Sequence, residues 1–251
     1  MSKRILVTGA VGFLGKAVCA GLQKNGHIVF RTYRGSGGGR LDGDLVCDLK
    51  EISDIDISSR QIDVVIHCSA KVPSSARDIG RYKKENVDCT ETLVKAAVKS
   101  GVKRIVFISS LSVYEGVVNT GPITIATQLK PKSFYAISKI EAENVIISCA
   151  EKSNLEVVII RPPLIYGPGV KGNFKHLIKW IGMGLPLPFG SFVQLRSFVS
   201  SYNLVSLVLT CINHEKASGN MFLVSDDDDV SIARVAEVVG FAMNKKTIAK
   251  H

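Results

Sequence analysis

The stretch ILVTGAVGFLG at residues 5–15 decides the fold of this chain. Its first three residues are a short continuous apolar run, which is typical of a strand buried on both faces. Glycines follow at positions 9, 12 and 15, with the first interval one residue longer than in the G-x-G-x-x-G pattern. Residues 16–25 then read as a helix that ends at Gly26. Because glycines let backbone N–H groups at a helix N-terminus approach an anion closely, this order of elements predicts a pyrophosphate site.

Strands and helices are predicted to alternate along the rest of the chain. Short apolar runs with turn residues between them read as strands, and longer segments with a one-sided apolar stripe read as helices. This alternation predicts an α/β fold with a doubly wound parallel sheet. The expected strands are residues 5–7, 27–33, 45–47, 63–70 (with a small-residue exit), 104–109 and 157–161, and the expected helices include 16–25, 82–99, 135–151 and 231–244.

The character of the chain changes after Pro162 and Pro163, where proline- and glycine-rich stretches interrupt the periodic pattern. We therefore expect residues 1–166 to form the nucleotide-binding domain. Residues 167–251 are expected to form a small substrate-binding lobe, interleaved with the last strands of the sheet. Four consecutive acids at 226–229 resemble a metal loop, but such a run is more typical of the cap of a helix, here the one predicted over 231–244.

The end of the second predicted strand bears on the form of the cofactor. A fold of this kind that selects NAD normally ends this strand with an acid for the ribose 2′-hydroxyl. Here the strand ends with Arg31 and Arg34, and the next acid is Asp42. Two arginines without a carboxylate favour a 2′-phosphate, so NADP is favoured over NAD.

Composition excludes several classes of function. The chain has 251 residues, 46% of them hydrophobic and 22% charged, as expected of an ordinary globular protein. Its net charge of +10 is spread over single basic residues without interleaved aromatics, so nucleic-acid binding is not expected. The six cysteines have no metal-ligand spacing, which indicates reduced thiols, no metal site and a cytoplasmic location. No apolar run reaches the ~18–20 residues that a membrane span needs.

Three side chains form a candidate catalytic group. Tyr135 and Lys139 are four residues apart on a predicted helix and therefore lie on one face of it. A lysine ammonium close to a phenol lowers the phenol's pKa, so that the tyrosine can exchange a proton with a carbinol or a ketone. Ser110 follows the strand at 104–109, at the end where open α/β sheets bind ligands. His67, by contrast, is expected to be a hydrogen-bonded core histidine rather than a catalyst.

Taken together, these motifs resemble the extended short-chain dehydrogenase/reductases. The most similar branch is the NAD-dependent epimerase/dehydratase family that acts on nucleotide-sugars, and the resemblance covers about residues 4–240. It implies a Rossmann fold. The residues that carry it are 8–15, Asp48-Leu49, Asn86-Val87, Ser109 to Tyr114, Tyr135 with Lys139, and Arg161 to Gly169.

The resemblance implies a role for each matching position. Tyr135 would be the general acid/base, Lys139 would tune its pKa and anchor the ribose, and Ser110 would donate to the reacting oxygen. Asn86 would support the lysine. With Arg34 added from the strand end, the predicted cofactor-binding residues are Gly9, Gly12, Phe13, Leu14, Arg34, Asp48, Leu49, Ser69, Ala70, Asn86, Tyr135, Lys139 and Pro162. The predicted substrate-binding residues are Ser110, Asn173 and Arg196, the last two for the nucleotide diphosphate.

Two departures from the family pattern bear on function. Family members are usually longer, so the C-terminal lobe is expected to be incomplete. Sugar 4,6-dehydratases carry an Asp-Glu pair directly after the catalytic hydroxyl residue, where this chain has Leu111 and Ser112. An elimination reaction would therefore lack its acid and base.

The expected function is NAD(P)-dependent redox chemistry at C4 of a nucleotide-sugar, with a UDP-linked sugar as the expected substrate. The sequence favours a 4-epimerase and a 4-keto reductase about equally. The absence of an acid at the end of the second strand favours the reductase, and the frequency of epimerases in the family favours the epimerase. The alternatives are a non-catalytic dinucleotide-binding or sensing protein and a reductase of a non-sugar ketone. Asn173 and Arg196 favour a diphosphate over the non-sugar ketone. A homodimer is left open.

Overall fold

The computed structural model describes residues 2–33, 44–46, 48–73, 78–117, 121–170, 173–183 and 195–245. The chain divides into two compact units. The first unit contains Met1–Pro162 and Leu204–Val224, and the second contains Pro163–Asn203 and Ser225–His251. The assignment of cofactor and substrate to separate parts of the chain stays a prediction.

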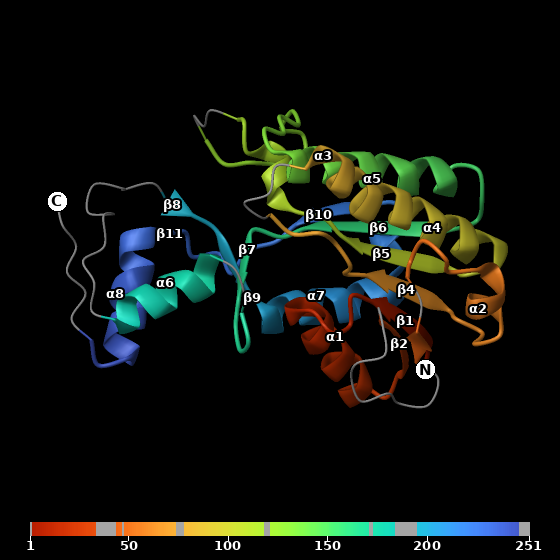
Figure 1. Cartoon of the computed structure of the whole chain (residues 1–251), viewed down its shortest axis with the longest axis horizontal. Coiled ribbons are helices and arrows are strands. Elements are labelled where there is room, and N and C mark those ends of the chain that lie inside the picture. Colours follow the sequence, from red (N-terminus) through yellow and green to blue (C-terminus); the bar gives the residue numbers. More distant parts are fainter. Residues whose placement is uncertain are drawn as a thin grey trace. The chain divides into compact units, whose positions relative to one another are not determined.

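A seven-stranded parallel sheet forms the centre of the first unit (Figure 1). Its order is β10-β6-β5-β4-β1-β2-β3, so the direction of strand addition reverses between β1 and β4. This confirms the predicted doubly wound sheet, and the reversal creates the switch point where such sheets bind ligands. The strands are β1 (Arg4–Thr8), β2 (Ile28–Tyr33), β3 (Leu45–Val46), β4 (Val64–His67), β5 (Arg104–Ile108), β6 (Glu156–Arg161) and β10 (Met221–Leu223).

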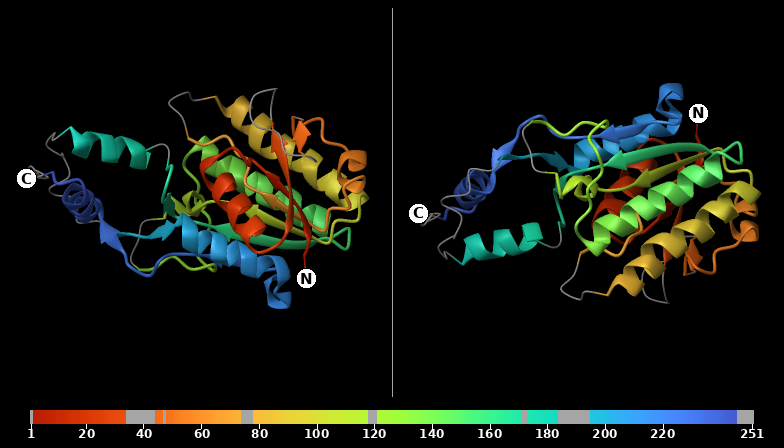
Figure 2. Two further views of the ribbon diagram at one scale, coloured as in Figure 1. Left: turned by 90° about the horizontal axis from the view of Figure 1, so that it is seen from below. Right: turned by 90° about the horizontal axis from the view of Figure 1, so that it is seen from above.

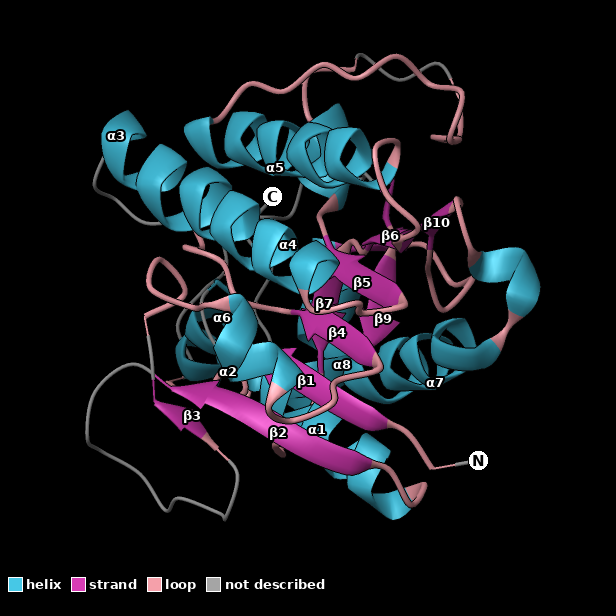
Figure 3. Cartoon of the chain, turned by 90° about the vertical axis from the view of Figure 1, so that its right-hand side faces the viewer, coloured by secondary structure: helices cyan, strands magenta, loops and turns pink. Residues whose placement is uncertain are grey.

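Helices cover both faces of the sheet (Figure 3). α4 and α5 pack side by side on one face, and α1 and α7 lie on the other. The helical segments of this unit are α1 (Phe13–Lys24), α2 (Asp54–Ser58), α3 (Ile79–Tyr82), a π-helical turn (Lys83–Asp88), α4 (Cys89–Lys99), two 3-10 turns (Leu111–Tyr114 and Glu215–Ala217), α5 (Phe134–Ala150) and α7 (Ser201–Asn213), of which the second unit holds the first three residues.

The core lies between the sheet and its helices. Every residue of β4 and β5 is buried, as expected for strands covered on both faces. Leu6, Val65 and Ile105 pack with Leu93 and Ile146 in one apolar cluster beneath α4 and α5. Each such side chain contributes about 1.5–3 kcal/mol through burial, so this cluster holds the strand ends in place.

The helix predicted over residues 82–99 differs from the one observed. Residues Lys83–Asp88 form a π-helical turn, and the regular helix begins only at Cys89. The side chain of Asn86 is turned inward here and bonds the backbone of Lys71 in both directions, at 2.6 and 3.2 Å. These tertiary bonds replace regular helical geometry, and π-turns of this kind are frequent at functional sites.

The second unit has two small sheets and a helix pair. β7 (Leu164–Tyr166) pairs with β9 (Phe198–Ser200), and β8 (Leu195–Arg196) pairs with β11 (Val230–Ser231). α6 (Asn173–Gly182) lies beside α8 (Ile232–Ala242) (Figure 2), with Ile181 and Ala236 buried in their contact.

The acidic run at 226–229 was expected to cap α8, and this expectation is wrong for Asp226. The cap is Ser231, whose hydroxyl accepts a hydrogen bond from the Arg234 amide at 3.1 Å. Asp226 instead accepts hydrogen bonds from the Tyr166 hydroxyl at 2.7 Å and the Ser200 amide at 2.9 Å. Its carboxylate therefore ties together β7 and β9.

Membrane spans, metal sites and disulfides can be assessed only for the described part of the chain. No described helix is long and apolar enough to cross a membrane. No group of histidine, cysteine and acidic residues in the described ranges could hold a metal. The five described cysteines are free thiols, and Cys47 lies outside the described residues.

Candidate active site

The turn between β1 and α1 is built so closely that it requires glycine. Gly9 has a φ of +67°, and a Cβ on it would lie 2.8 Å from the Ser69 backbone. A Cβ on Gly15 would overlap the carbonyl oxygen of Gly9, and one on Gly12 would lie 3.0 Å from the same oxygen. The turn therefore packs against itself and against the segment that leaves β4.

The N-terminus of α1 is suited to an anion. Gly12 occupies the N-cap position and has no side chain to bond the first N–H groups of the helix. Those groups belong to the turn that contains Phe13 and Leu14, at the positive end of the helix dipole. The close glycine turn and the uncapped helix fit the pyrophosphate of a dinucleotide, as predicted for Gly9, Gly12, Phe13 and Leu14.

His67 is a core histidine, as expected. Its Nδ1 lies 2.6 Å from the Thr8 hydroxyl and its Nε2 lies 2.9 Å from the Thr90 hydroxyl. The Thr90 hydroxyl donates to the carbonyl of Asn86 at 2.5 Å, and the Thr8 hydroxyl accepts from the Ser69 amide at 3.2 Å. These directions leave Nε2 as the protonated ring nitrogen, with Thr8 donating to Nδ1.

The histidine is neutral at physiological pH. Burial, with a smaller effect of the Lys139 charge, lowers the pKa of His67 to about 3. The hydrogen-bonded chain from Ser69 to Asn86 therefore holds without a charge on the ring. It joins the end of β1, the exit of β4 and the π-helical turn.

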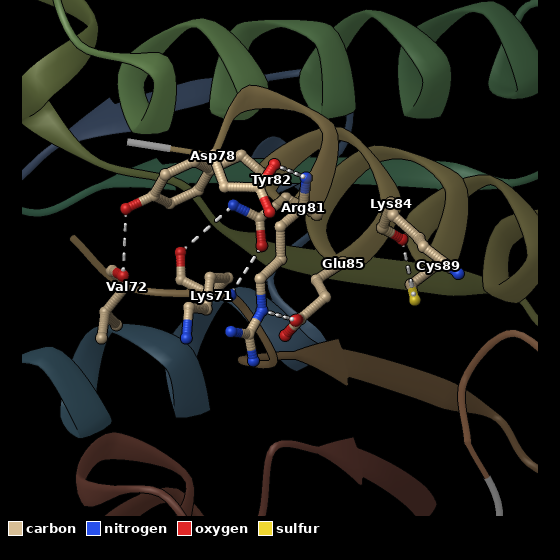
Figure 4. A network of polar contacts seen from close by, with 9 residues as sticks. Lys71, Val72, Asp78, Arg81, Tyr82, Lys84, Glu85 and Cys89 are labelled. Atoms are coloured by element: carbon tan, nitrogen blue, oxygen red, sulfur yellow. Dashed lines mark hydrogen bonds and ion pairs between the residues drawn. The ribbon is translucent and has the colours of Figure 1, made fainter. Parts of the chain in front are cut away.

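The segment that follows β4 is also held by the π-helical turn and by α3. Asn86 of the turn bonds the backbone N–H and C=O of Lys71. The hydroxyl of Tyr82 in α3 donates to the Val72 carbonyl at 3.5 Å (Figure 4). The other amide hydrogen of Asn86 is directed to the Ser138 hydroxyl at 2.9 Å. Ser69 and Ala70, which were predicted to bind the cofactor, lie partly buried at the start of this segment.

Lys139 is almost completely buried below the carboxyl end of β5. Its ammonium donates to the Ile108 carbonyl at 2.8 Å and lies 4.0 Å from the centre of the Phe107 ring. Burial lowers the pKa of Lys139 to about 7, while Glu143 and then Cys68 act in the opposite direction.

Ser110 and Tyr135 are brought together in space. The Ser110 side chain lies close enough to the Tyr135 phenol to act on its pKa, and the Ser110 hydroxyl accepts from the Ser112 amide at 3.1 Å. Burial raises the pKa of Tyr135, although the Ser110 side chain acts to lower it. The lowering of this pKa by Lys139, which we predicted, is absent because the ammonium is directed to Ile108. Tyr135 is therefore a protonated phenol here.

Sequence reasoning missed a buried ionic cluster beside these residues. Glu143 and Arg161 form a two-pronged ion pair, at 2.6 Å between Nη2 and Oε2 and 3.0 Å between Nε and Oε1. Ser109 donates to Glu143, and Arg161 donates to the Tyr114 hydroxyl. The spacing in the sequence could have indicated Glu143, because it lies four residues after Lys139 and eight after Tyr135 and therefore on the same helix face.

Three other predicted cofactor-binding positions border the first unit's core. Asp48 accepts a hydrogen bond from the Lys50 amide at 3.3 Å, and Leu49 is buried in the apolar cluster. Pro162 is buried, and its carbonyl accepts from the Leu111 amide at 2.8 Å.

Of the two arginines predicted to be uncompensated at the end of β2, Arg31 is paired, so the prediction is wrong for this residue. Arg31 donates to both carboxylate oxygens of Asp44, at 3.0 and 2.6 Å, so its charge is already compensated. A carboxylate therefore does lie at this strand end. It belongs to Asp44, which follows Asp42 in the sequence and was not assigned to the strand end. Arg34 and Asp42 lie outside the described residues.

The two predicted diphosphate residues belong to the second unit. Asn173 is the first residue of α6. Arg196 is exposed in β8, where it pairs with Val230 of β11.

Comparison with known proteins gives consistent matches. The sequence model of the NAD dependent epimerase/dehydratase family matches residues 5–225. A UDP-glucose 4-epimerase of Vibrio cholerae is 39% identical over 255 residues, which cover 98% of this chain and 78% of that protein. The structure of MoeE5 in complex with UDP-glucose and NAD superposes with a TM-score of 0.85, at 26% identity, over 98% of this chain and 84% of that one. A UDP-glucuronic acid 4-epimerase of Bacillus cereus shares the fold, with a TM-score of 0.87 at 22% identity over 98% of this chain and 86% of that chain.

Proposed function

The chain belongs to the NAD dependent epimerase/dehydratase family, and on that premise we propose that it is a UDP-sugar 4-epimerase. It is an NAD-dependent enzyme that acts at C4 of a nucleotide-sugar. The similarity to a UDP-glucose 4-epimerase over nearly the whole chain supports this choice over the 4-keto reductase.

The observation that carries the proposal is that Ser110 and Tyr135 lie next to each other, with Lys139 buried one helical turn further on. A phenol and a hydroxyl side by side suit a proton transfer at an alcohol or ketone oxygen. The glycine turn supports a dinucleotide next to it. NAD, held by the glycine turn, would supply the acceptor and donor of the C4 hydride.

The protein's own residues handle the proton and the charge. Tyr135 as phenolate takes the proton of the C4 hydroxyl while the C4 hydride leaves, and it returns that proton when the ketone is reduced. Ser110 donates a hydrogen bond to the same oxygen. In the structure the Lys139 ammonium donates to the Ile108 carbonyl, so we propose that it turns toward Tyr135 during turnover, where its charge would favour the phenolate over the phenol. Re-reduction from the opposite face of the sugar inverts C4.

Elimination is not expected at this site. Leu111 and Ser112 occupy the two positions after the catalytic serine, and neither carries an acid. Asn173 and Arg196 are proposed to bind the diphosphate, because an amide and a guanidinium suit phosphate oxygens.

The preference for NADP over NAD stays a proposal. Of the two arginines on which it was based, Arg31 is paired with Asp44, so Arg34 is the proposed ligand of a 2′-phosphate. A homodimer and a cytoplasmic location are likewise proposed, the second because the cysteine usage suits a reducing compartment.

The test is to incubate the purified protein with NAD⁺ and UDP-glucose and to separate the products by chromatography. Formation of UDP-galactose, with no net change in nicotinamide absorbance, supports the epimerase. Stoichiometric oxidation of NADPH by a UDP-4-keto-6-deoxy sugar, without epimer interconversion, would show that the reductase is right. No turnover of either substrate, with dinucleotide still bound, would favour the non-catalytic alternative.

A further inference from the structure

Glu143 lies on the same face of α5 as the two catalytic residues of that helix. Tyr135, Lys139 and Glu143 follow one another at steps of four. Only 2% of Glu143 is exposed. A carboxylate at such a position loses its hydration, so it is retained only where its surroundings compensate for the charge.

The compensation comes from two elements, at the ends of β6 and β5. Arg161 at the end of β6 supplies both prongs of the ion pair and is 3% exposed. Ser109 after β5 donates its hydroxyl to the same carboxylate oxygen that accepts from the Arg161 Nε. Arg161 also donates to the hydroxyl of Tyr114, at the end of the 3-10 turn. The carboxylate is thus the common acceptor of a closed cluster.

This cluster holds both sides of the catalytic serine. Ser109 directly precedes Ser110, and Ser110 is the N-cap of the turn that ends at Tyr114. With Ser109 bound to Glu143 and Tyr114 bound to Arg161, the backbone on either side of Ser110 is fixed.

The same carboxylate lies one helical turn from Lys139 and acts on its charge. The Lys139 ammonium contacts the Phe107 ring and the Ile108 carbonyl of β5, and His67 and Cys68, from β4 and the residue after it, also interact with it electrostatically. His67 is neutral, and burial raises the pKa of the Cys68 thiol to about 12. Within the described part of the chain, Glu143 is therefore the full negative charge that acts on Lys139 at neutral pH.

We infer that Glu143 is a positioning residue of this active site, which holds the strand end that carries Ser110 and places a negative charge one helical turn from Lys139. The inference rests on the proposed function for its link to turnover. Its effect on Lys139 is independent of any substrate. Glu143 touches neither the substrate nor the reacting atoms and acts through these two residues.

The experiment compares Glu143→Gln, Glu143→Gln/Arg161→Met and Glu141→Gln, the last a matched change at an exposed position of the same helix. Lysine labelled with ¹³C at Cε reports the titration of Lys139 by NMR without substrate, and the Lys139→Met variant assigns its signal. An opposite charge nearby commonly shifts a pKa by about 1–3 units. We therefore expect Lys139 to titrate about one unit lower or more in both Glu143 variants and unchanged in Glu141→Gln.

The pH profile of turnover distinguishes positioning from mere stability. Above its pKa, the charged fraction of Lys139 falls about tenfold for each unit, so the alkaline loss of kcat should move to lower pH by the same shift. Glu143→Gln leaves Arg161 buried without its ion pair, so its melting temperature should fall, and most of that fall should be recovered in the double variant. The altered pH profile should persist in the double variant.

If the double variant recovered the wild-type pH profile along with its stability, the inference would be overturned. An unchanged Lys139 titration in both Glu143 variants would also overturn it. If the single variant does not fold, the double variant gives both measurements. If the wild type lacks epimerase activity but the Lys139 titration moves as expected, the charge effect on Lys139 stands and the proposed function fails.

Discussion

Replacing Gly9 by alanine tests the idea that close packing at the glycine turn forms the dinucleotide site. Alanine at this position would adopt a φ of +67°, and its Cβ would lie 2.8 Å from backbone atoms of Ser69. The steric clash cannot be relieved by rotating a side chain, because the atoms that the new Cβ would meet are backbone atoms. The two segments must therefore separate.

The expected magnitude has two parts. The left-handed backbone conformation costs an alanine about 1–2 kcal/mol, and overpacking adds about 1–3 kcal/mol. The sum of about 2–5 kcal/mol corresponds to a fall in Tm of roughly 4–20 °C for a chain of this size. If the shifted turn loses one charge-assisted hydrogen bond to the pyrophosphate, worth about 1.5–3 kcal/mol, the Kd for NAD rises roughly 10- to 150-fold.

Gly26→Ala is the matched control. Gly26 has a φ of +77°, but a Cβ on it would meet nothing within 4 Å, so its variant carries the backbone cost alone. Its Tm should fall by roughly 2–8 °C with unchanged NAD affinity. Thermal unfolding and a fluorescence titration with NADH measure both quantities. Equal losses of Tm in the two variants, with equal NADH affinity, would refute the reasoning.

Three further changes test the rest of the site. Tyr135→Phe should lower kcat by about 10²–10⁴-fold and leave NADH affinity intact, because only the transferable proton is lost; turnover within about threefold of wild type would remove Tyr135 from catalysis. His67 is kept neutral in the folded protein, with its pKa lowered to about 3, so its contribution to stability is complete above pH 6.5 and is lost as the pH falls towards 3. Between pH 7 and pH 5 the unfolding free energy should therefore fall by about 2 kcal/mol more in wild type than in His67→Gln, and parallel curves in urea titrations would contradict this. Arg34→Ala should weaken NADPH binding more than NADH binding, and equal losses in fluorescence titrations would exclude a 2′-phosphate contact.

The sequence alone predicted those features that depend on neighbours along the chain. The strand, glycine turn and helix at residues 5–26 appear as expected because each part is specified by local propensity and spacing. Tyr135 and Lys139 share a helix face for the same reason. The apolar run at residues 104–109 was read as a buried strand, and Ser110 comes directly after it, so its place at the strand end was also predictable. His67 was also predicted to be a core histidine, whereas its neutrality was shown only by its burial in the fold.

Pairing between distant side chains was decided only by the tertiary structure. Arg31 meets Asp44 across 13 residues, Arg161 meets Glu143 across 18, and Thr8 meets His67 across 59. No periodicity connects such positions, so a sequence shows that a charge is present but not whether it is compensated. Burial sets the protonation of Tyr135 and Lys139 in the same way, because the loss of hydration depends on everything packed around them. The candidate catalytic residues were thus readable from the chain, whereas their electrostatic environment required the fold.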